Sequence, residues 1–451
     1  MATLSQLPNE ILMTIALEVE PGDVVNFATA CKIVYYASEA ALKRHVALQL
    51  QYQKIKNHDN GTFRSLSWLL REVLKNPPIG YYVRELWLHG WVDGLWSPQD
   101  EDKESDVRFV AAAFEQSGLP LLPYNDAAIK LRDRCKTLTI VLLFLHLPSL
   151  SLLRWKVEMA DNEDYLVLQY LRHMFTEYSP PVLTKLRTVI LQDRDCTLRN
   201  GVGSIPEHFI SSFFLCPSVQ TIKARTINEH FGLPGAPESP SEPPARLSNV
   251  SELTLNFYRR RDCSSEEAYR WLDKMLGSIK ALRKCQYRML PFSTVGDGGM
   301  NNLLQIHAQH SLEELKFPYR GKLQALPTGS LRRFTKLRVL EIEIIGPYRY
   351  PASRATFKAR ELPRSLQQLR LWIHGDEFIE VCLEEVEELI EQTKMLPRMT
   401  SVELYCHDLH DFLSKQDVKK CQDQIKMIRE RGRQVGVSVD VKTCVGPRTD
   451  F

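Results

Sequence analysis

Beyond residue 80, apolar residues recur in one short pattern, in which two residues separate the first apolar position from the second and one residue separates the second from the third. The copies are Val83-Leu86-Leu88, Leu186-Val189-Leu191, Val219-Ile222-Ala224, Val250-Leu253-Leu255, Leu282-Cys285-Tyr287, Leu312-Leu315-Phe317, Leu337-Leu340-Ile342, Leu366-Leu369-Leu371 and Met399-Val402-Leu404. From Val189 onward, the middle positions are 25 to 33 residues apart, which suits one short strand plus one helix. The spacing therefore predicts a repeat of strand, turn and helix.

The segments between these strands carry apolar residues at helical spacing. Helices are predicted at about 164–175, 206–214, 264–276, 300–307, 378–396 and 415–431. Two further strands are predicted around Leu138–Ile140 and Leu153–Trp155, where the repeat is irregular. Because the inward apolar positions of one unit would stack on those of the next, the chain is predicted to form an α/β fold, a curved solenoid of short parallel strands alternating with helices.

A different pattern occupies the first 50 residues, where apolar side chains follow two short helices. They are Ile11, Leu12, Ile15, Val19, Val24, Phe27, Ala28 and Cys31. Pro8 suits the first turn of a helix because it lacks an N–H that would have no partner there, and Pro21-Gly22 ends the run. A third helical run is predicted at 35–48. A unit of this size is small for a self-sufficient core, so we expect it to need a partner.

These residues resemble the F-box, whose pattern begins Leu-Pro-x-Glu-Ile-Leu. The matching residues are Leu7, Pro8, Glu10, Ile11, Leu12, Ile15, Asp23, Phe27, Cys31, Lys32 and Tyr35. Val24 stands where the family usually has Leu, and Tyr35 stands where Trp is common. The repeats behind this segment are similar to the degenerate leucine-rich repeats of fungal F-box proteins, although the Asn or Cys that often ends the strand segment is mostly missing. An ordinary amphipathic helix pair is the alternative reading of the N-terminus.

The patterns divide the chain into an F-box at 1–50, a helical linker or cap at 51–80, a leucine-rich-repeat solenoid at 81–442 and a tail at 443–451. A segment rich in Pro, Gly and Ser at 232–246 interrupts the repeats without changing their spacing, so it is expected to be a surface loop. A Pro-rich motif for a partner is the alternative for that loop.

The overall charge names no partner class. The chain has 58 basic and 55 acidic side chains, a formal net charge of +3, which is far from the basic excess of a dedicated nucleic-acid binder. Ten cysteines without a CxxC pair favour reduced thiols. Because no signal peptide or membrane-spanning run is evident, we expect the protein in the cytoplasm or the nucleus, with no membrane and no nucleic acid among its partners.

The strand residues between the inward apolar positions are expected to face a common open surface. Those singled out as able to bind a substrate are Trp87, Lys223, Arg225, Arg288, Lys316, Arg370, Trp372 and Tyr405. Arginine and lysine beside aromatic rings suit acidic or phosphorylated peptides. A solvated sheet face that happens to carry charge is the alternative, since Glu252 and Glu314 lie on the same strands.

Candidate catalytic and metal-binding patterns are weak. The run Cys406-His407-Asp408-Leu409-His410-Asp411 contains possible ligands, but it has no second ligand pair at a useful spacing, so a surface turn is favoured. The glycines at 296, 298 and 299 lack the Lys-Ser/Thr ending of a phosphate loop and are also interpreted as a turn. The sequence predicts no enzyme activity, no metal and no cofactor; a hydrolase hidden in the repeats is the disfavoured alternative.

The resemblance implies a substrate receptor of an SCF-type ubiquitin ligase. The F-box residues Leu7, Pro8, Ile11, Leu12, Ile15, Val24, Phe27 and Cys31 would bind a Skp-type adaptor, which links to a cullin and a RING subunit. The repeats would bind the protein substrate. The alternative from another class is an adaptor-bound interaction scaffold that forms no ligase.

Overall fold

The computed structural model describes residues 4–56, 66–88, 102–120, 131–157, 162–179, 181–193, 205, 207–228, 247–258, 265–289, 297–319, 328–345, 359–374, 379–406 and 415–443. The chain folds into two compact units. The first comprises residues 1–203 and 208–219, and the second comprises residues 204–207 and 220–451. Both are of the α/β class, with parallel strands that follow one another in sequence order.

The first unit begins with helices and continues as strands alternating with helices. The helices are α1 (Asn9–Glu18), α2 (Val24–Ala28), α3 (Lys32–Ala37), α4 (Glu39–Tyr52), α5 (Leu66–Lys75), α6 (Asp102–Gln116), α7 (Leu131–His146), α8 (Asn162–Thr176) and α9 (Glu207–Phe214). The strands are β1 (Lys54–Lys56), β2 (Glu85–Leu88), β3 (Leu152–Val157) and β4 (Thr188–Asp193), and 3-10 turns lie at Leu4–Gln6 and Pro77–Tyr81.

The second unit repeats the same alternation. Its strands are β5 (Thr221–Asn228), β6 (Glu252–Tyr258), β7 (Lys284–Met289), β8 (Glu314–Tyr319), β9 (Val339–Ile345), β10 (Gln368–His374), β11 (Ser401–Cys406) and β12 (Ser438–Thr443). The helices are α10 (Ser265–Ser278), α11 (Asp297–Ala308), α12 (Ile379–Glu391) and α14 (Lys415–Gln434), with 3-10 turns at Thr328–Arg333, Ala359–Glu361 and Thr393–Met395.

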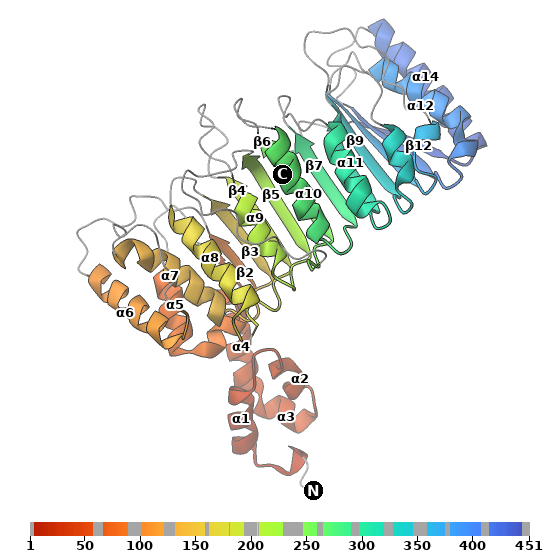
Figure 1. The fold of residues 1–451 in the computed structure, drawn as a ribbon. Coiled ribbons are helices and arrows are strands. Elements are labelled where there is room, and N and C mark those ends of the chain that lie inside the picture. The colour runs from red at the N-terminus through yellow and green to blue at the C-terminus, as the bar shows by residue number, and fades with distance from the viewer. Residues whose placement is uncertain are drawn as a thin grey trace. The chain divides into compact units, whose positions relative to one another are not determined.

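Each of the nine predicted strand copies coincides with an observed strand, and the inward apolar positions form ladders. Leu340 of β9 pairs with Leu369 of β10, and Leu369 pairs with Val402 of β11. All three side chains are fully buried. Helices cover one face of the strands within each unit (Figure 1), so every second strand side chain enters the core and the others point to the opposite face. We call that opposite face the open face.

Backbone hydrogen bonds join each repeat to the next just before the strands. The amide of Arg338 donates to the carbonyl of Glu313, that of Gln367 to Arg338, and that of Thr400 to Gln367, at 2.8 Å each. The amide of Ser438 continues the series to Thr400 at 2.9 Å. Because the main chain makes these bonds itself, successive repeats are joined here without help from side chains.

The strand predicted around Leu138–Ile140 is wrong, because both residues lie in α7. The residues that follow them in α7, from Val141 to Phe144, are all fully buried. A helix that is apolar around its whole circumference has no amphipathic period, so a short apolar run cannot be assigned to strand or helix by periodicity alone. The strand predicted around Leu153–Trp155 is present as β3.

The repeat array begins earlier than predicted. The segment 51–80, expected to be a helical linker, contains β1, and β1 pairs in parallel with β2 through Ile55 and Leu86. At the other end β12, which the pattern did not predict, extends the array to Thr443. The glycine-rich segment interpreted as a turn contributes Asp297 to Gly299 to the first turn of α11. The Pro-rich segment 232–246 lies outside the described residues.

Candidate functional site

The residues predicted to bind an adaptor occupy three environments in the N-terminal module, residues 4–52. Leu12 and Val24 are buried, with 0% and 5% of their surface exposed, so the prediction that they contact a partner is corrected: they hold α1 and α2 against the other helices of the module. Pro8 and Ile11 are exposed. The others, Leu7, Ile15, Phe27 and Cys31, are half-buried and present part of their surface to solvent.

The module exposes further apolar side chains that the motif did not single out. Among the described residues, fifteen large apolar side chains are exposed, and ten of them lie before residue 51: Leu4, Ile11, Met13, Leu17, Val25, Ile33, Tyr35, Tyr36, Val46 and Leu50. Single exposed apolar residues are ordinary, but a concentration of this kind is typical of surfaces that take part in protein–protein contacts. Apolar residues lying off the main helical stripe are the sequence signal for this surface.

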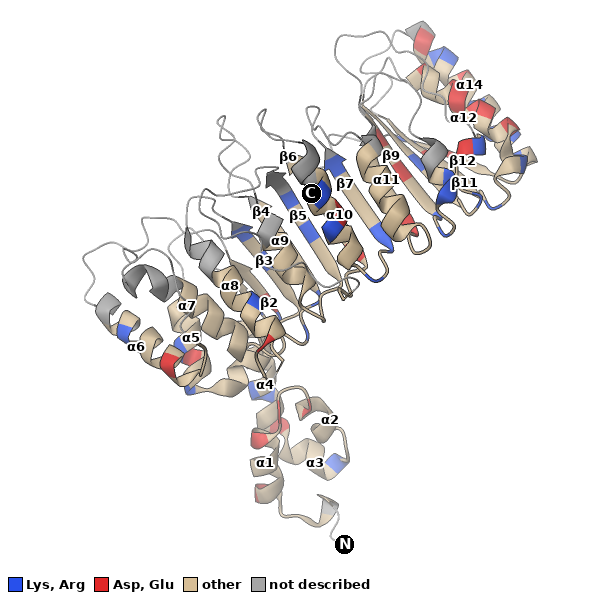
Figure 2. Ribbon diagram, in the orientation of Figure 1, with Lys and Arg blue, Asp and Glu red and all other residues tan. Residues whose placement is uncertain are grey.

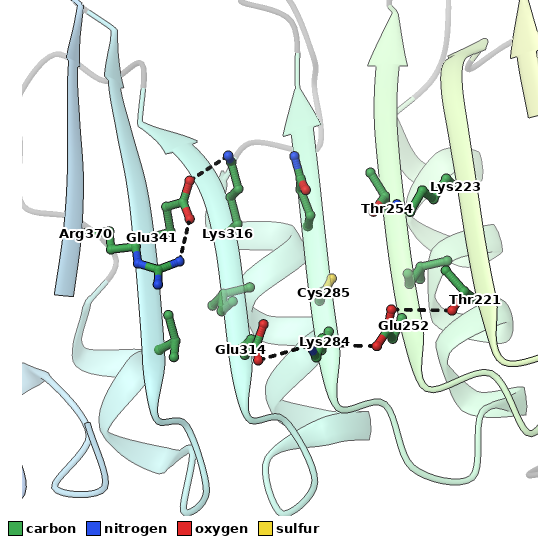
Figure 3. Close-up of a pocket in the computed structure, with 14 residues that line it drawn as sticks. Thr221, Lys223, Glu252, Thr254, Lys284, Cys285, Glu314, Lys316, Glu341 and Arg370 are labelled. Carbon is green, nitrogen blue, oxygen red and sulfur yellow. Dashed lines mark hydrogen bonds and ion pairs between the residues drawn. The ribbon is translucent and has the colours of Figure 1, made fainter. Parts of the chain in front are cut away.

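On the second unit, the open face of β5 to β10 is hollowed into a shallow groove of about 350 Å³ (Figure 3). Its lining includes Thr221, Lys223, Glu252, Lys284, Lys316 and Arg370, which come from alternate strand positions. Basic and acidic residues both occur on the strands of this unit (Figure 2). The groove is therefore a polar surface of mixed charge.

At one end of the groove, Lys284 lies between two carboxylates on the neighbouring strands. Its ammonium is 3.1 Å from Glu314 on β8 and 3.8 Å from Glu252 on β6. The hydrogen bond to Glu314 raises the pKa of Lys284, so this side chain stays charged over the physiological range. Thr221 donates its hydroxyl to Glu252 at 3.4 Å. Cross-strand charge pairs thus fix this end of the groove.

At the other end, Glu341 on β9 lies between cations on both neighbouring strands. It is 2.6 Å from the ammonium of Lys316 on β8 and 3.7 Å from the guanidinium of Arg370 on β10. Arg370 in turn lies 3.2 Å from Glu403 on β11. Only 11% of the Glu341 side chain and 19% of the Lys316 side chain are exposed. Arg288 is similarly placed 3.4 Å from Glu343.

The ion pairs that link Lys316, Glu341, Arg370 and Glu403 lead to an aromatic stack on β10 and β11. The rings of Trp372 and Tyr405 are stacked at 4.0 Å between centroids, with 5° between their planes. Tyr405 donates its hydroxyl to Glu403 at 2.6 Å, and Lys442 lies 3.1 Å from the same carboxylate. Burial alone would raise the pKa of Glu403, but the hydrogen bonds from Tyr405 and Lys442 and the charge of Arg370 lower it below its ordinary value.

The predicted substrate-binding residues therefore differ in what they offer a partner. Lys316 and Arg370 have carboxylate partners on adjacent strands, and Arg288 on β7 has Glu343 on β9, so the basic patch predicted there is neutralised. Trp372 is 7% exposed, and Tyr405 is half-buried in the same stack. Lys223 is exposed and Arg225 half-buried on β5. Trp87 lies in the first unit, in a different environment that is strongly basic.

The described residues offer little for catalysis. They contain no cluster of three or more His, Cys, Asp or Glu side chains able to hold a metal ion. Cys406 is buried, and the remainder of the run Cys406–Asp411 lies outside the described residues. Burial raises the pKa of the Cys285 thiol to about 12 and also raises that of Cys216, which makes both thiols poor nucleophiles.

No protein-family model matches this chain, and a search of curated proteins finds no relative. Within the part of the chain that the structure describes, no helix is both long enough and apolar enough to cross a bilayer.

Proposed function

We propose that this protein is the substrate receptor of an SCF-type ubiquitin ligase, in which the N-terminal module binds a Skp-type adaptor and the strand-and-helix array binds a protein substrate. The observation that carries the proposal is the concentration of exposed apolar side chains in the module, ten of the fifteen in the described residues. Together with the F-box-like order of residues, it marks the module as a docking element.

The surface proposed for the adaptor differs from the set of motif residues. Exposed apolar side chains on α1 to α3 form it, among them Ile11, Leu17, Val25 and Ile33. The motif residues Leu12 and Val24 support it from inside the module. This division is what a small helical domain needs, because a few inward residues must hold the helices while the outward ones give the partner its apolar area.

The array supports the second half of the proposal. Its parallel strands present an open face of polar and aromatic side chains on a scaffold braced by cross-strand ion pairs and by backbone bonds between repeats. A rigid surface of this kind suits binding because little order has to be gained on association. The receptor would contribute to ubiquitin transfer by holding a substrate lysine near a thioester formed on another subunit.

The test is affinity capture of the intact protein carrying Ile11→Asp and Leu17→Asp, from cells in which the proteasome is inhibited. Both residues are more than 40% exposed, so the module should stay folded while a charge enters the proposed interface. We expect loss of the Skp-type adaptor and the cullin together. Ile306→Asp is the matched control, because Ile306 is 64% exposed on α11 in the second unit.

The outcomes separate the alternatives. Unchanged adaptor capture by the double variant would reject the proposed docking surface. If the wild-type chain captures the adaptor but never the cullin, the protein is an adaptor-bound scaffold. Far-UV circular dichroism of the purified variants establishes that the module has kept its helices.

A further inference from the structure

The open face of the first unit carries a cluster of positive charge around one indole ring. The ammonium groups of Lys54 and Lys56 lie 4.3 Å and 4.2 Å from the ring centroid of Trp87, and the guanidinium carbon of Arg154 lies 4.4 Å from it. We call these four residues the Trp87 cluster. Strand register explains the arrangement, because Lys56 on β1 and Arg154 on β3 are the cross-strand partners of Trp87 on β2.

Little within the described residues neutralises this cluster. Glu85 is the only carboxylate paired with it there, at 3.5 Å from Lys54. Three cations and one carboxylate leave a net charge of +2. The contrast with the second unit is sharp, because Lys316 and Arg370 on its open face each have a carboxylate on an adjacent strand. Cations held together at this spacing repel one another, so the arrangement favours an incoming anion.

The cluster also contains two unused hydrogen-bond donors. The indole Nε1–H of Trp87 and the Nε–H of Arg154 are buried and have no acceptor in the structure. An unsatisfied buried donor costs free energy, and few occur in a folded chain. Together with the lysine ammonium groups, these N–H groups give the Trp87 cluster several hydrogen-bond donors and no acceptor. The complementary ligand is an anion with several acceptor oxygens.

We infer that the Trp87 cluster binds a phosphomonoester carried by a peptide chain. A phosphomonoester has a charge of about −1.5 to −2 at pH 7 and three acceptor oxygens, which match the net charge of the cluster and its set of donors better than one carboxylate does. The inference rests on the proposed receptor function and names the group that the receptor recognises. Binding would draw the flexible lysine ammonium groups from the ring toward the phosphate.

The surroundings favour a peptide over a polyanion. Ile190 on β4 is the register partner of Arg154; it lies at an outward position between Val189 and Leu191, and only 9% of its surface is exposed. Thr188 and Gln192, the other outward residues of β4, are uncharged. A nucleic-acid backbone needs successive cations along its path, and these do not continue onto β4, whereas a peptide needs to place only one phosphate on the cluster.

The test uses the purified full-length protein and a degenerate peptide library with a fixed central phosphoserine, beside the same library with serine and with glutamate. We expect measurable binding of the phosphoserine library alone. Lys56→Ala with Arg154→Ala should weaken binding by about tenfold or more, since each removes a charge-assisted contact. Lys185→Ala, which removes an exposed cation outside the cluster, should leave binding unchanged.

Two conservative variants keep the test decisive if the double variant does not fold. Trp87→Phe keeps an aromatic ring but removes the indole N–H, and Arg154→Lys keeps the charge but removes the guanidinium donors; each should weaken binding. Equal binding of the serine library, no binding of the phosphoserine library, or tighter binding to phosphatidylinositol-phosphate vesicles or single-stranded RNA would overturn the inference. The assay needs no adaptor, so its failure is distinct from failure of the adaptor capture.

Discussion

Lys316 and Glu341 face each other across β8 and β9 at 2.6 Å, with both side chains largely removed from solvent. Glu341 also contacts Arg370, so it is shared between two cations on opposite sides. Its loss would affect two charges, whereas the loss of Lys316 would affect one.

We therefore predict an asymmetry between the two halves of this pair. Glu341→Leu removes the carboxylate that Lys316 and Arg370 both contact, and it should lower the free energy of unfolding by about 3 kcal/mol, as breaking one side of a buried pair typically does. Lys316→Met leaves Glu341 with Arg370 and should cost less. Urea unfolding of both variants measures the difference. Equal losses would show that the two cations do not share Glu341.

The lowered pKa of Glu403 predicts acid sensitivity at the same end of the groove. A carboxyl group with a pKa below its unfolded value contributes stability above that value, and the contribution is lost as the pH falls through the lower folded pKa. The ordinary value is 4.5, so the loss should occur below about that pH. Tyr405→Phe removes one hydrogen bond that lowers the pKa of Glu403, so its pKa should rise. Side-chain NMR titration of Glu403 in both proteins checks the direction.

Gly80 is predicted to be intolerant of any side chain. A Cβ atom at this position would lie 2.0 Å from the main-chain carbonyl oxygen of His146, at the end of α7, so the backbone would have to move. We expect Gly80→Ala to destabilise the first unit by about 1–3 kcal/mol, as overpacking usually does. Gly22→Ala is the matched control, because nothing lies within 4 Å of its added methyl group. Thermal unfolding followed by circular dichroism compares the two variants.

Gly436 has a different requirement, which comes from its backbone angle. Its φ is +79°, in the left-handed region, where it follows the C-terminus of α14, and the amide of Val437 then donates to the carbonyl of Gly432 at 2.8 Å. This is the position at which helices commonly end with glycine. Gly436→Ala should destabilise the end of α14 and β12 by about 1 kcal/mol. Hydrogen exchange of the β12 amides measures the effect; unchanged protection would contradict it.

The strands were predictable because each has its own local apolar signal. Leu369 and Leu371 in β10 are both fully buried, as the alternation requires. Of the two strands that were not predicted, β12 alternates Val439 and Val441 but has Gly436 where the pattern has its first apolar residue. Strand β1 has only Ile55 between two lysines, and it pairs through its backbone with β2. Pairing between distant segments of this kind cannot be derived from a local pattern.

The open face was predicted in position but not in charge. The alternation placed Lys316, Arg370 and Tyr405 on it, yet the ion pairs that neutralise Lys316 and Arg370 join residues 25 or more positions apart. Which lysine contacts which carboxylate depends on the register between strands. This register depends on the lengths of the loops, and the local pattern of apolar residues does not predict it. The Trp87 cluster escaped prediction for the same reason, since β1 itself was not expected.

The N-terminal module gives the last prediction, because Ile11 and Leu12 are adjacent and have opposite roles. Leu12 is fully buried, whereas Ile11 is 48% exposed. Both belong to the same motif, and the helical stripe alone did not say which of them faces the other helices. Leu12→Ala should therefore cost about 2–5 kcal/mol through lost burial and a cavity, and the module should become sensitive to proteolysis. Ile11→Ala should change stability by less than about 0.5 kcal/mol while weakening adaptor capture. Limited proteolysis and adaptor capture, run on both variants, separate folding from docking, and equal protease sensitivity of the two would contradict the assignment.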